Sequence, residues 1–189
     1  MTLPEYFSKM KGTTKSPPGV GFGELVWSWL GGFIGIGSCA ILSARYFEPR
    51  DLTLLIGSFG ASAVLAYGAI KSPLAQPRNL VGGHIISAIS GVAAYHLFGD
   101  TLWLAAAAGV SLAIVAMLAT KTLNPPGGAT ALIAVIGGPK IHALGYLYAF
   151  VPAGAGALVL VVVALLVNNL SRNCFLRLYA QTNSHEKEA

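Results

Sequence analysis

Apolar residues fall into six long runs, and short segments between the runs hold the charges. The runs cover residues 25–44, 52–70, 80–98, 101–120, 122–139 and 141–167. A helix of about 20 apolar residues crosses a bilayer. Because backbone groups in hydrocarbon must bond within the chain, such runs are mostly helical, and the alternating strands of a membrane barrel do not occur in the sequence. The pattern predicts an all-α membrane protein.

The second and fifth runs each contain a break in their first half. Gly57 and Gly60 interrupt the second run, and Asn124, Pro125 and Pro126 interrupt the fifth. Proline has no backbone N–H and disfavours a helical residue before it. Asparagine is a common N-cap residue, and proline suits the first helical turn. Both runs are therefore predicted to be an extended arm followed by a half-helix, with Asn124 as a capping residue.

The two broken runs share a short sequence. Gly-Ala-Ser-Ala at 60–63 precedes Gly-Ala-Thr-Ala at 128–131 by 68 residues, and each copy lies in the middle of a group of three runs. Two groups of three, related by inversion, form a common architecture of transporters. We therefore expect a 3+3 inverted repeat.

Composition narrows the class of protein. Hydrophobic residues make up 54% of the 189-residue chain and charged residues only 10%, whereas soluble domains have about 25% charged residues. This excludes a soluble enzyme and a nucleic-acid-binding protein. No Asp, Glu, Lys or Arg lies within any of the six runs, which disfavours a cation transporter, because a desolvated cation needs an acidic partner. No catalytic motif or metal-ligand spacing occurs, so no cofactor is expected.

The basic residues test the number of crossings, because cytoplasmic loops carry an excess of Lys and Arg. Six crossings with a cytoplasmic N-terminus place nine basic residues inside and three outside, whereas re-entrant second and fifth runs give six on each side. The first arrangement is favoured. It makes residues 1–23 a cytoplasmic arm, 24–170 the transmembrane domain and 171–189 a cytoplasmic tail.

The starts of the two half-helices form the candidate substrate site. A helix N-terminus has free N–H donors and a partial positive charge, which suit an anion. Two such ends, facing each other inside the membrane, would bind a small anion without a buried cation. The alternative is that the small residues here only permit close helix packing. The candidate residues are Ser58, Phe59, Gly60, Ala61, Ser62, Asn124, Pro126, Gly127, Gly128, Ala129 and Thr130.

Two further features are candidates for accessory roles. His84 lies well inside the third run and is a candidate gate or proton-linked group; a neutral histidine bonded to a neighbouring helix is the favoured alternative. The loop before this run contains Lys71, Gln76 and Arg78. These residues would attract anions to a cytoplasmic mouth, or they serve only to anchor the topology.

Three segments together resemble one known family. They are Gly-Ser-Phe-Gly-Ala-Ser-Ala-Val-Leu at 57–65, Ser-Pro-Leu-Ala-Gln-Pro-Arg-Asn-Leu-Val-Gly-Gly-His at 72–84, and Asn-Pro-Pro-Gly-Gly-Ala-Thr-Ala at 124–131. Over residues 20–170 the chain is similar to the HPP family of integral membrane proteins. The family is named for His-Pro-Pro, and Asn124 stands in place of that histidine. The resemblance implies nitrite transport, which is associated with plant plastid and cyanobacterial members.

The resulting hypothesis is a small-anion transporter, with nitrite as the substrate that the resemblance implies. A membrane interaction subunit that does not transport is the alternative, and an intramembrane enzyme is a third class. The expected partners are the anion and the lipid bilayer, with a homo-oligomer as a further expectation. The short N-terminal arm favours a bacterial or cyanobacterial plasma membrane.

Overall fold

A computed structural model describes residues 19–48 and 55–170, and all regular structure in these ranges is helical. The expected all-α class is confirmed for this part of the chain. The helices are α2 (Phe22–Leu42) with η1 (Ser43–Phe47), α3 (Ser58–Ala63) with η3 (Val64–Gly68), η4 (Pro73–Ala75), α4 (Pro77–Phe98), α5 (Leu102–Ala119), α6 (Pro125–Ile136), α7 (Pro139–Leu144), η5 (Gly145–Ala149), η6 (Phe150–Gly154) and α8 (Ala155–Leu170).

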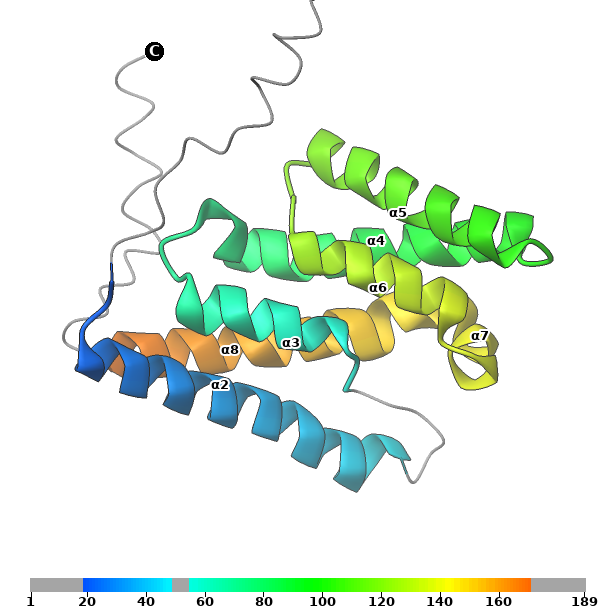
Figure 1. Cartoon of the computed structure of the whole chain (residues 1–189). Coiled ribbons are helices and arrows are strands. Elements are labelled where there is room, and N and C mark those ends of the chain that lie inside the picture. The colour runs from blue at the N-terminus through cyan, green and yellow to red at the C-terminus, as the bar shows by residue number, and fades with distance from the viewer. Residues whose placement is uncertain (1–18, 49–54, 171–189) are drawn as a thin grey trace, which may run out of the picture.

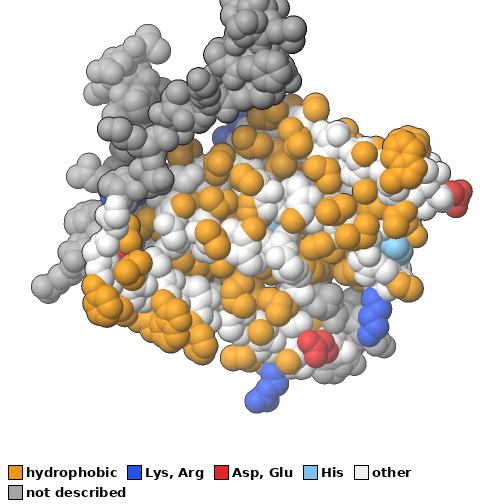
Figure 2. Space-filling model, viewed as in Figure 1, with side chains coloured by type: hydrophobic (Ala, Val, Ile, Leu, Met, Phe, Trp, Pro, Cys, Tyr) orange, Lys and Arg blue, Asp and Glu red, His pale blue; other side chains and the backbone are white. Residues whose placement is uncertain are grey.

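The surface of the helical bundle is that of a membrane protein. Within the described ranges, four helical segments are long and apolar enough to cross a bilayer: Phe22–Phe47, Pro77–Phe98, Leu102–Ala119 and Pro139–Leu170. Figure 2 shows apolar side chains across the middle of the viewed face and charged side chains toward its edges. Exposed large residues such as Trp29, Phe33 and Trp103 lie on the outer helices, where a bilayer would cover them.

Successive passes of the chain run in opposite directions (Figure 1). The chain reverses after α2, after η3, after α4, after α5 and after α6, so α8 returns beside α2. The first turn of α4 meets the turn between α5 and α6, because Arg78 donates to Thr120 O at 2.9 Å and Asn79 donates to Leu123 O at 2.8 Å. The cytoplasmic arm and tail that the sequence predicts lie almost wholly outside the described residues.

The second and fifth runs form the expected short helices. The second becomes helical at Ser58 and continues to Gly68, and the fifth forms the 12-residue helix α6 from Pro125. At 1.5 Å per residue these helices are about 16–18 Å long, roughly half the thickness of a hydrocarbon core. The breaks at Gly57 and at Asn124–Pro126 are therefore confirmed, whereas Gly60 lies inside α3 and does not interrupt it. Residues 52–54 of the extended arm expected in the second run lie outside the described residues.

The sixth run, residues 141–167, is not one continuous helix. Val151 has extended backbone angles (φ −135°, ψ 116°), and this kink separates the short helices α7 and η5 from α8. Pro152 follows directly, and a residue before proline is pushed out of the helical region. The uninterrupted part, α8, is 16 residues long.

Close packing at the centre depends on positions without side chains. A Cβ at Gly91 of α4 would overlap the backbone of Ala131 in α6, and a Cβ at Gly31 of α2 would lie 2.5 Å from Cδ1 of Tyr67. Small residues allow membrane helices to approach in this way. Close helix packing, the alternative role considered for small residues, is therefore the role of these two glycines. At Gly91 it brings α4 and α6 together around the candidate site.

Candidate functional site

Polar side chains from three helices meet at the centre of the bundle. Nε2 of His84 in α4 lies 2.6 Å from Oγ of Ser62 in α3, and Nδ1 lies 2.6 Å from Oγ1 of Thr130 in α6. Thr130 Oγ1 also donates to Oγ of Ser58 at 2.8 Å. We call these four residues, Ser58, Ser62, His84 and Thr130, the hydroxyl–imidazole cluster. It joins both half-helices through one histidine.

The cluster is fully enclosed by protein. Each of its four side chains is at most 1% exposed, as are Phe59 and Tyr148 beside it. The ring of Phe59 meets His84 edge-on at a centroid distance of 5.3 Å, and the hydroxyl of Tyr148 donates to Thr130 O at 3.1 Å. Buried polar groups in a membrane protein are costly unless paired and commonly mark functional positions.

The half-helix starts do not present the free N–H donors that the sequence predicted. The N–H groups of Phe59, Gly60 and Gly127 each donate to a carbonyl three residues earlier, at 3.0, 3.2 and 2.8 Å. Pro125 and Pro126 have no N–H at all. In addition, α3 and α6 lie antiparallel (Figure 1), and Ser58 at the start of α3 contacts Thr130 in the second turn of α6. The two helices thus run in opposite directions with overlapping starts, and the expected free donors are not observed at Phe59, Gly60 and Gly127.

Several predicted site residues face away from the cluster. Gly60, Ala61 and Ala129 are exposed. The nearest neighbour to a Cβ at Gly128 would be Val110 of α5 at 4.0 Å, whereas Gly127 packs against Ser87 of α4 and Met117 of α5. Pro126 contributes its carbonyl, which is 3.4 Å from Thr130 Oγ1. Of the predicted set, Ser58, Phe59, Ser62 and Thr130 come together, as does His84.

Asn124 is the N-cap residue of α6, but its side chain makes no capping bond. The side chain is fully buried, and neither Nδ2 nor Oδ1 has a partner within the described structure. It lies over Gly83 of α4, since a Cβ at Gly83 would be 2.5 Å from Asn124 Cβ. The expected capping role is therefore not observed, although the helix does begin where the sequence places it.

The predicted cytoplasmic mouth is a polar end of the bundle that is separate from the cluster. Gln76 precedes the first turn of α4, Lys71 is exposed, and the guanidinium of Arg78 donates to Thr120 O at the end of α5. His84 lies six residues after Arg78 on α4, about 9 Å along the helix axis. Arg78 therefore acts in the structure as a C-terminal partner of α5.

Residues 17–175 match the family model described as HPP, transmembrane region. The chain belongs to the HPP transmembrane family. Two curated transmembrane proteins of Dictyostelium discoideum are similar to this HPP protein, one at 49% identity over 172 residues and the other at 43% over 184 residues. The first match covers 89% of this chain and 55% of the relative, and the second covers 95% and 64%.

The chain thus spans less than two thirds of the length of these relatives. No solved structure matches this HPP protein. Both relatives align with most of this chain, in agreement with the family assignment. Their names state only that they are transmembrane proteins.

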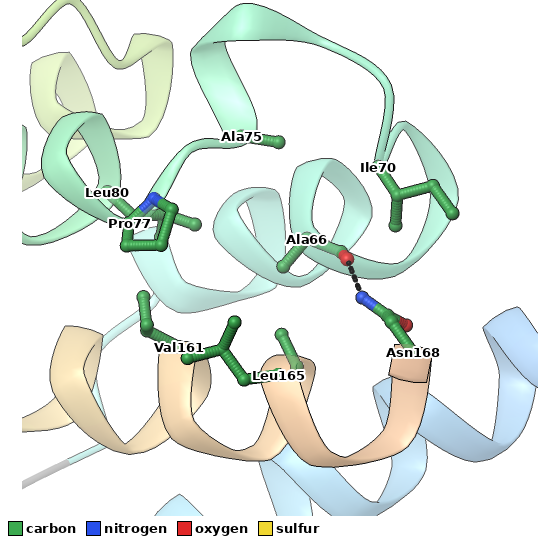
Figure 3. A pocket seen from close by; sticks show the side chains of 9 residues that line it. Ala66, Ile70, Ala75, Pro77, Leu80, Val161, Leu165 and Asn168 are labelled. Atoms are coloured by element: carbon green, nitrogen blue, oxygen red, sulfur yellow. Dashed lines mark hydrogen bonds between the residues drawn. The ribbon is translucent and has the colours of Figure 1, made fainter. Parts of the chain in front are cut away.

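The HPP protein also has a small apolar pocket away from the cluster (Figure 3). Its one amide side chain, Asn168 of α8, already donates to Ala66 O at 3.0 Å. The remaining lining residues are apolar, so this pocket is no candidate for an anion. They are Ala66, Ile70, Ala75, Pro77, Leu80, Val161, Ala164 and Leu165.

Three residues of the site were missed from the sequence. Tyr148 bonds the backbone of Thr130, Gly83 makes room for Asn124, and Ser87 donates to Sδ of Met117 at 3.4 Å beside Gly127. The Gly-Gly pair before His84 was the available signal for close packing. Tyr148 lies within an apolar run with no distinguishing neighbour. Among the described residues, no three His, Cys, Asp or Glu side chains gather in a metal-binding group.

Proposed function

We propose that this HPP protein transports a small inorganic anion through the crossing of α3 and α6, with nitrite as the first substrate to test. The observation that carries the proposal is the hydroxyl–imidazole cluster, which joins two half-helices through a fully buried histidine. Oriented hydroxyl and imidazole N–H groups bind anions without a permanent buried cation. The proposed donors are therefore side chains in place of the backbone N–H groups.

The arrangement of helix contacts supports a 3+3 inverted repeat. Exchanging the first three runs for the last three pairs α2 with α5, α3 with α6, and α4 with α8. Under this exchange the α4–α5 contact corresponds to α8–α2, the α4–α6 contact to α8–α3, and the α5–α6 contact to α2–α3, and all six occur. The α3–α6 and α4–α8 contacts correspond to themselves. We propose that the cluster lies near this pseudo-two-fold axis, as transporter sites commonly do.

Transport requires the two half-helices to separate, because the cluster is closed to solvent in this structure. α6 ends at Ile136 and is followed by Gly137 and Gly138, and Gly138 has a φ of +79°, a conformation that favours glycine. Such terminal positions can absorb the backbone change of a gating motion. We propose six crossings, both termini in the cytoplasm and no catalytic activity, and we retain a homo-oligomer as part of the proposal.

The close packing of the cluster favours a second candidate function, a membrane interaction subunit that does not transport. A flux assay separates the two. Purified protein in liposomes should admit nitrite faster than protein-free liposomes, and chloride, nitrate and formate should define the selectivity. Uptake should fall in Thr130→Val when it is normalised to inserted protein. Equal uptake with and without the wild-type protein for all four anions would support the subunit instead.

A further inference from the structure

The hydrogen bonds around His84 leave its protonation state open. A neutral imidazole has one donor nitrogen and one acceptor nitrogen, whereas an imidazolium has two donors. Both ring nitrogens face a hydroxyl oxygen at 2.6 Å, from Ser62 and from Thr130. A hydroxyl can either donate or accept. The geometry of the heavy atoms is therefore the same for both forms of the ring.

Each hydroxyl also has a second acceptor for its own proton. Ser62 Oγ lies 3.3 Å from Ser58 O, and Thr130 Oγ1 lies 2.8 Å from Ser58 Oγ and 3.4 Å from Pro126 O. When the Ser62 proton turns from Nε2 of His84 to Ser58 O, the oxygen becomes free to accept from the ring. The cluster can thus bind an added proton on His84 by rotation of one hydroxyl group.

The surroundings provide no negative charge for such an imidazolium. The parts of α3, α4, α5, α6 and α8 that the structure describes carry no Asp or Glu, and the basic residue on them, Arg78, lies at the start of α4. The other titratable groups facing this core are phenols and a thiol with partners of their own: Tyr148 donates to Thr130 O, Tyr67 to Leu160 O and Cys39 to Gly156 O. An isolated buried charge is very unfavourable.

We propose that His84 takes up one proton together with the transported anion, so that the protein is an electroneutral proton–anion symporter. This inference rests on the proposed function. The proton comes from water on the entry side and forms an N–H bond on the ring. It returns to water with the anion on the exit side, and no bond within the anion changes. The anion supplies the negative charge that the described helices around His84 lack, and the proton supplies the positive charge.

The test measures charge and proton movement in liposomes that contain the purified protein. Nitrite is added outside, a trapped dye reports lumenal pH, and potassium with valinomycin sets an inside-positive potential. A potential of about 60 mV would increase the accumulation of a lone anion about tenfold. Symport predicts lumenal acidification with nitrite entry and no such effect of the potential. Protein-free liposomes give the leak of nitrous acid, which is subtracted.

The key variant is His84→Gln, because glutamine keeps one donor and one acceptor but does not titrate. We expect the protein-dependent acidification to be at least tenfold slower in this variant than in the wild type. His96→Gln, on the exposed end of the same helix, should keep it. A direct measurement checks the same point if the variant folds poorly: nitrite added to wild-type protein in weakly buffered detergent should cause uptake of one proton per bound anion.

The outcomes separate the two proposals. Nitrite entry that responds to potential as a lone anion, without acidification, would overturn the symport and leave anion transport intact. Equal proton movement by His84→Gln and the wild type would do the same. No protein-dependent nitrite entry and no proton uptake in detergent would overturn both.

Discussion

The half-helices α3 and α6 begin in different ways, although each is short and follows a break. In α3 the first N–H groups bond the preceding turn, and its polar side chains, Ser58 and Ser62, take part in the cluster. In α6 two prolines remove the first donors, and the side chain of Asn124 is buried with no partner among the described residues. Thr130, in the second turn, connects α6 to the cluster. The starts of the two half-helices thus occupy similar places in the bundle but present different polar groups.

This difference shows where each half-helix tolerates change. α3 presents its small residue Gly60 to an open side, whereas α6 buries Gly127 between α4 and α5. α3 contributes two hydroxyl groups to the cluster, whereas α6 contributes one. The following substitutions test these contrasts, beginning with the largest expected effect.

Gly127→Val should cause the greatest loss of folded protein. A Cβ there would lie 2.6 Å from Oγ of Ser87, 2.9 Å from Sδ of Met117 and 3.0 Å from Gly83 O. Overpacking of this kind costs about 3 kcal/mol. The comparison variant in α3, Gly60→Val, changes an exposed glycine at which a Cβ would meet nothing within 4 Å, and it should alter stability by less than about 0.5 kcal/mol. Thermal unfolding in detergent compares the two, and equal losses would show that the contrast is wrong.

Thr130→Val should destabilise more than Ser62→Ala. Valine keeps the shape of threonine but leaves two buried side-chain groups, Nδ1 of His84 and Oγ of Ser58, without this partner. Ser62→Ala leaves one such group, Nε2 of His84, without its partner and also removes the longer 3.3 Å bond to Ser58 O. Each unpaired buried group costs about 1–3 kcal/mol. Chemical denaturation of both variants measures the difference. A larger loss of stability in Ser62→Ala would show that the hydrogen bond from α3, and not those from α6, contributes most to the stability of the cluster.

Asn124→Leu should change stability by less than about 1 kcal/mol, because the amide makes no hydrogen bond to lose. An N-cap residue that did bond the helix would cost about 1 kcal/mol when removed. The matched variant is Asn124→Ser, which restores a possible cap. The unfolding temperatures of the two variants test this expectation. A clearly lower unfolding temperature for Asn124→Leu, with recovery in Asn124→Ser, would establish a capping role.

Gly128→Ala should give the smallest effect, a gain of up to about 1 kcal/mol from helix propensity. The added methyl group would be 4.0 Å from Val110, an ordinary contact. Nitrite uptake per inserted protein should stay at the wild-type level, because the residue faces α5. Reduced uptake with normal folding would place the anion path on that face of α6.

The sequence identified the broken runs because breaks are local. Gly57 permits an irregular backbone and the prolines after Asn124 fix theirs, and both helices begin within two residues of the expected positions. The hydroxyls and His84 were also found from the sequence, since polar residues inside apolar runs are conspicuous. These predictions required only the residue types and their positions in the sequence.

What the sequence could not provide was direction and pairing. Whether Phe59 and Gly127 donate to a ligand or to their own turn depends on the conformation of the preceding residues. Which face of α6 meets α4 depends on close contacts such as Gly91 with Ala131, between segments forty residues apart. The prolines were the exception: their lack of N–H groups already argued against a donor site at the start of α6.

The most direct test of the central claim is a reversible lock between the half-helices. Ser58→Cys and Thr130→Cys, in a background without Cys39 and Cys174, place two thiols where the hydroxyl oxygens are 2.8 Å apart, close enough for a disulfide with small adjustments. Nitrite uptake is measured in the same liposomes before oxidation, after oxidation and after reduction. Thiols are weaker donors than the two hydroxyls that they replace, so we expect uptake below the wild-type level before oxidation. The disulfide should abolish this remaining uptake, and reductant should restore it to its level before oxidation. Unchanged uptake with a complete disulfide would contradict transport through the crossing of α3 and α6.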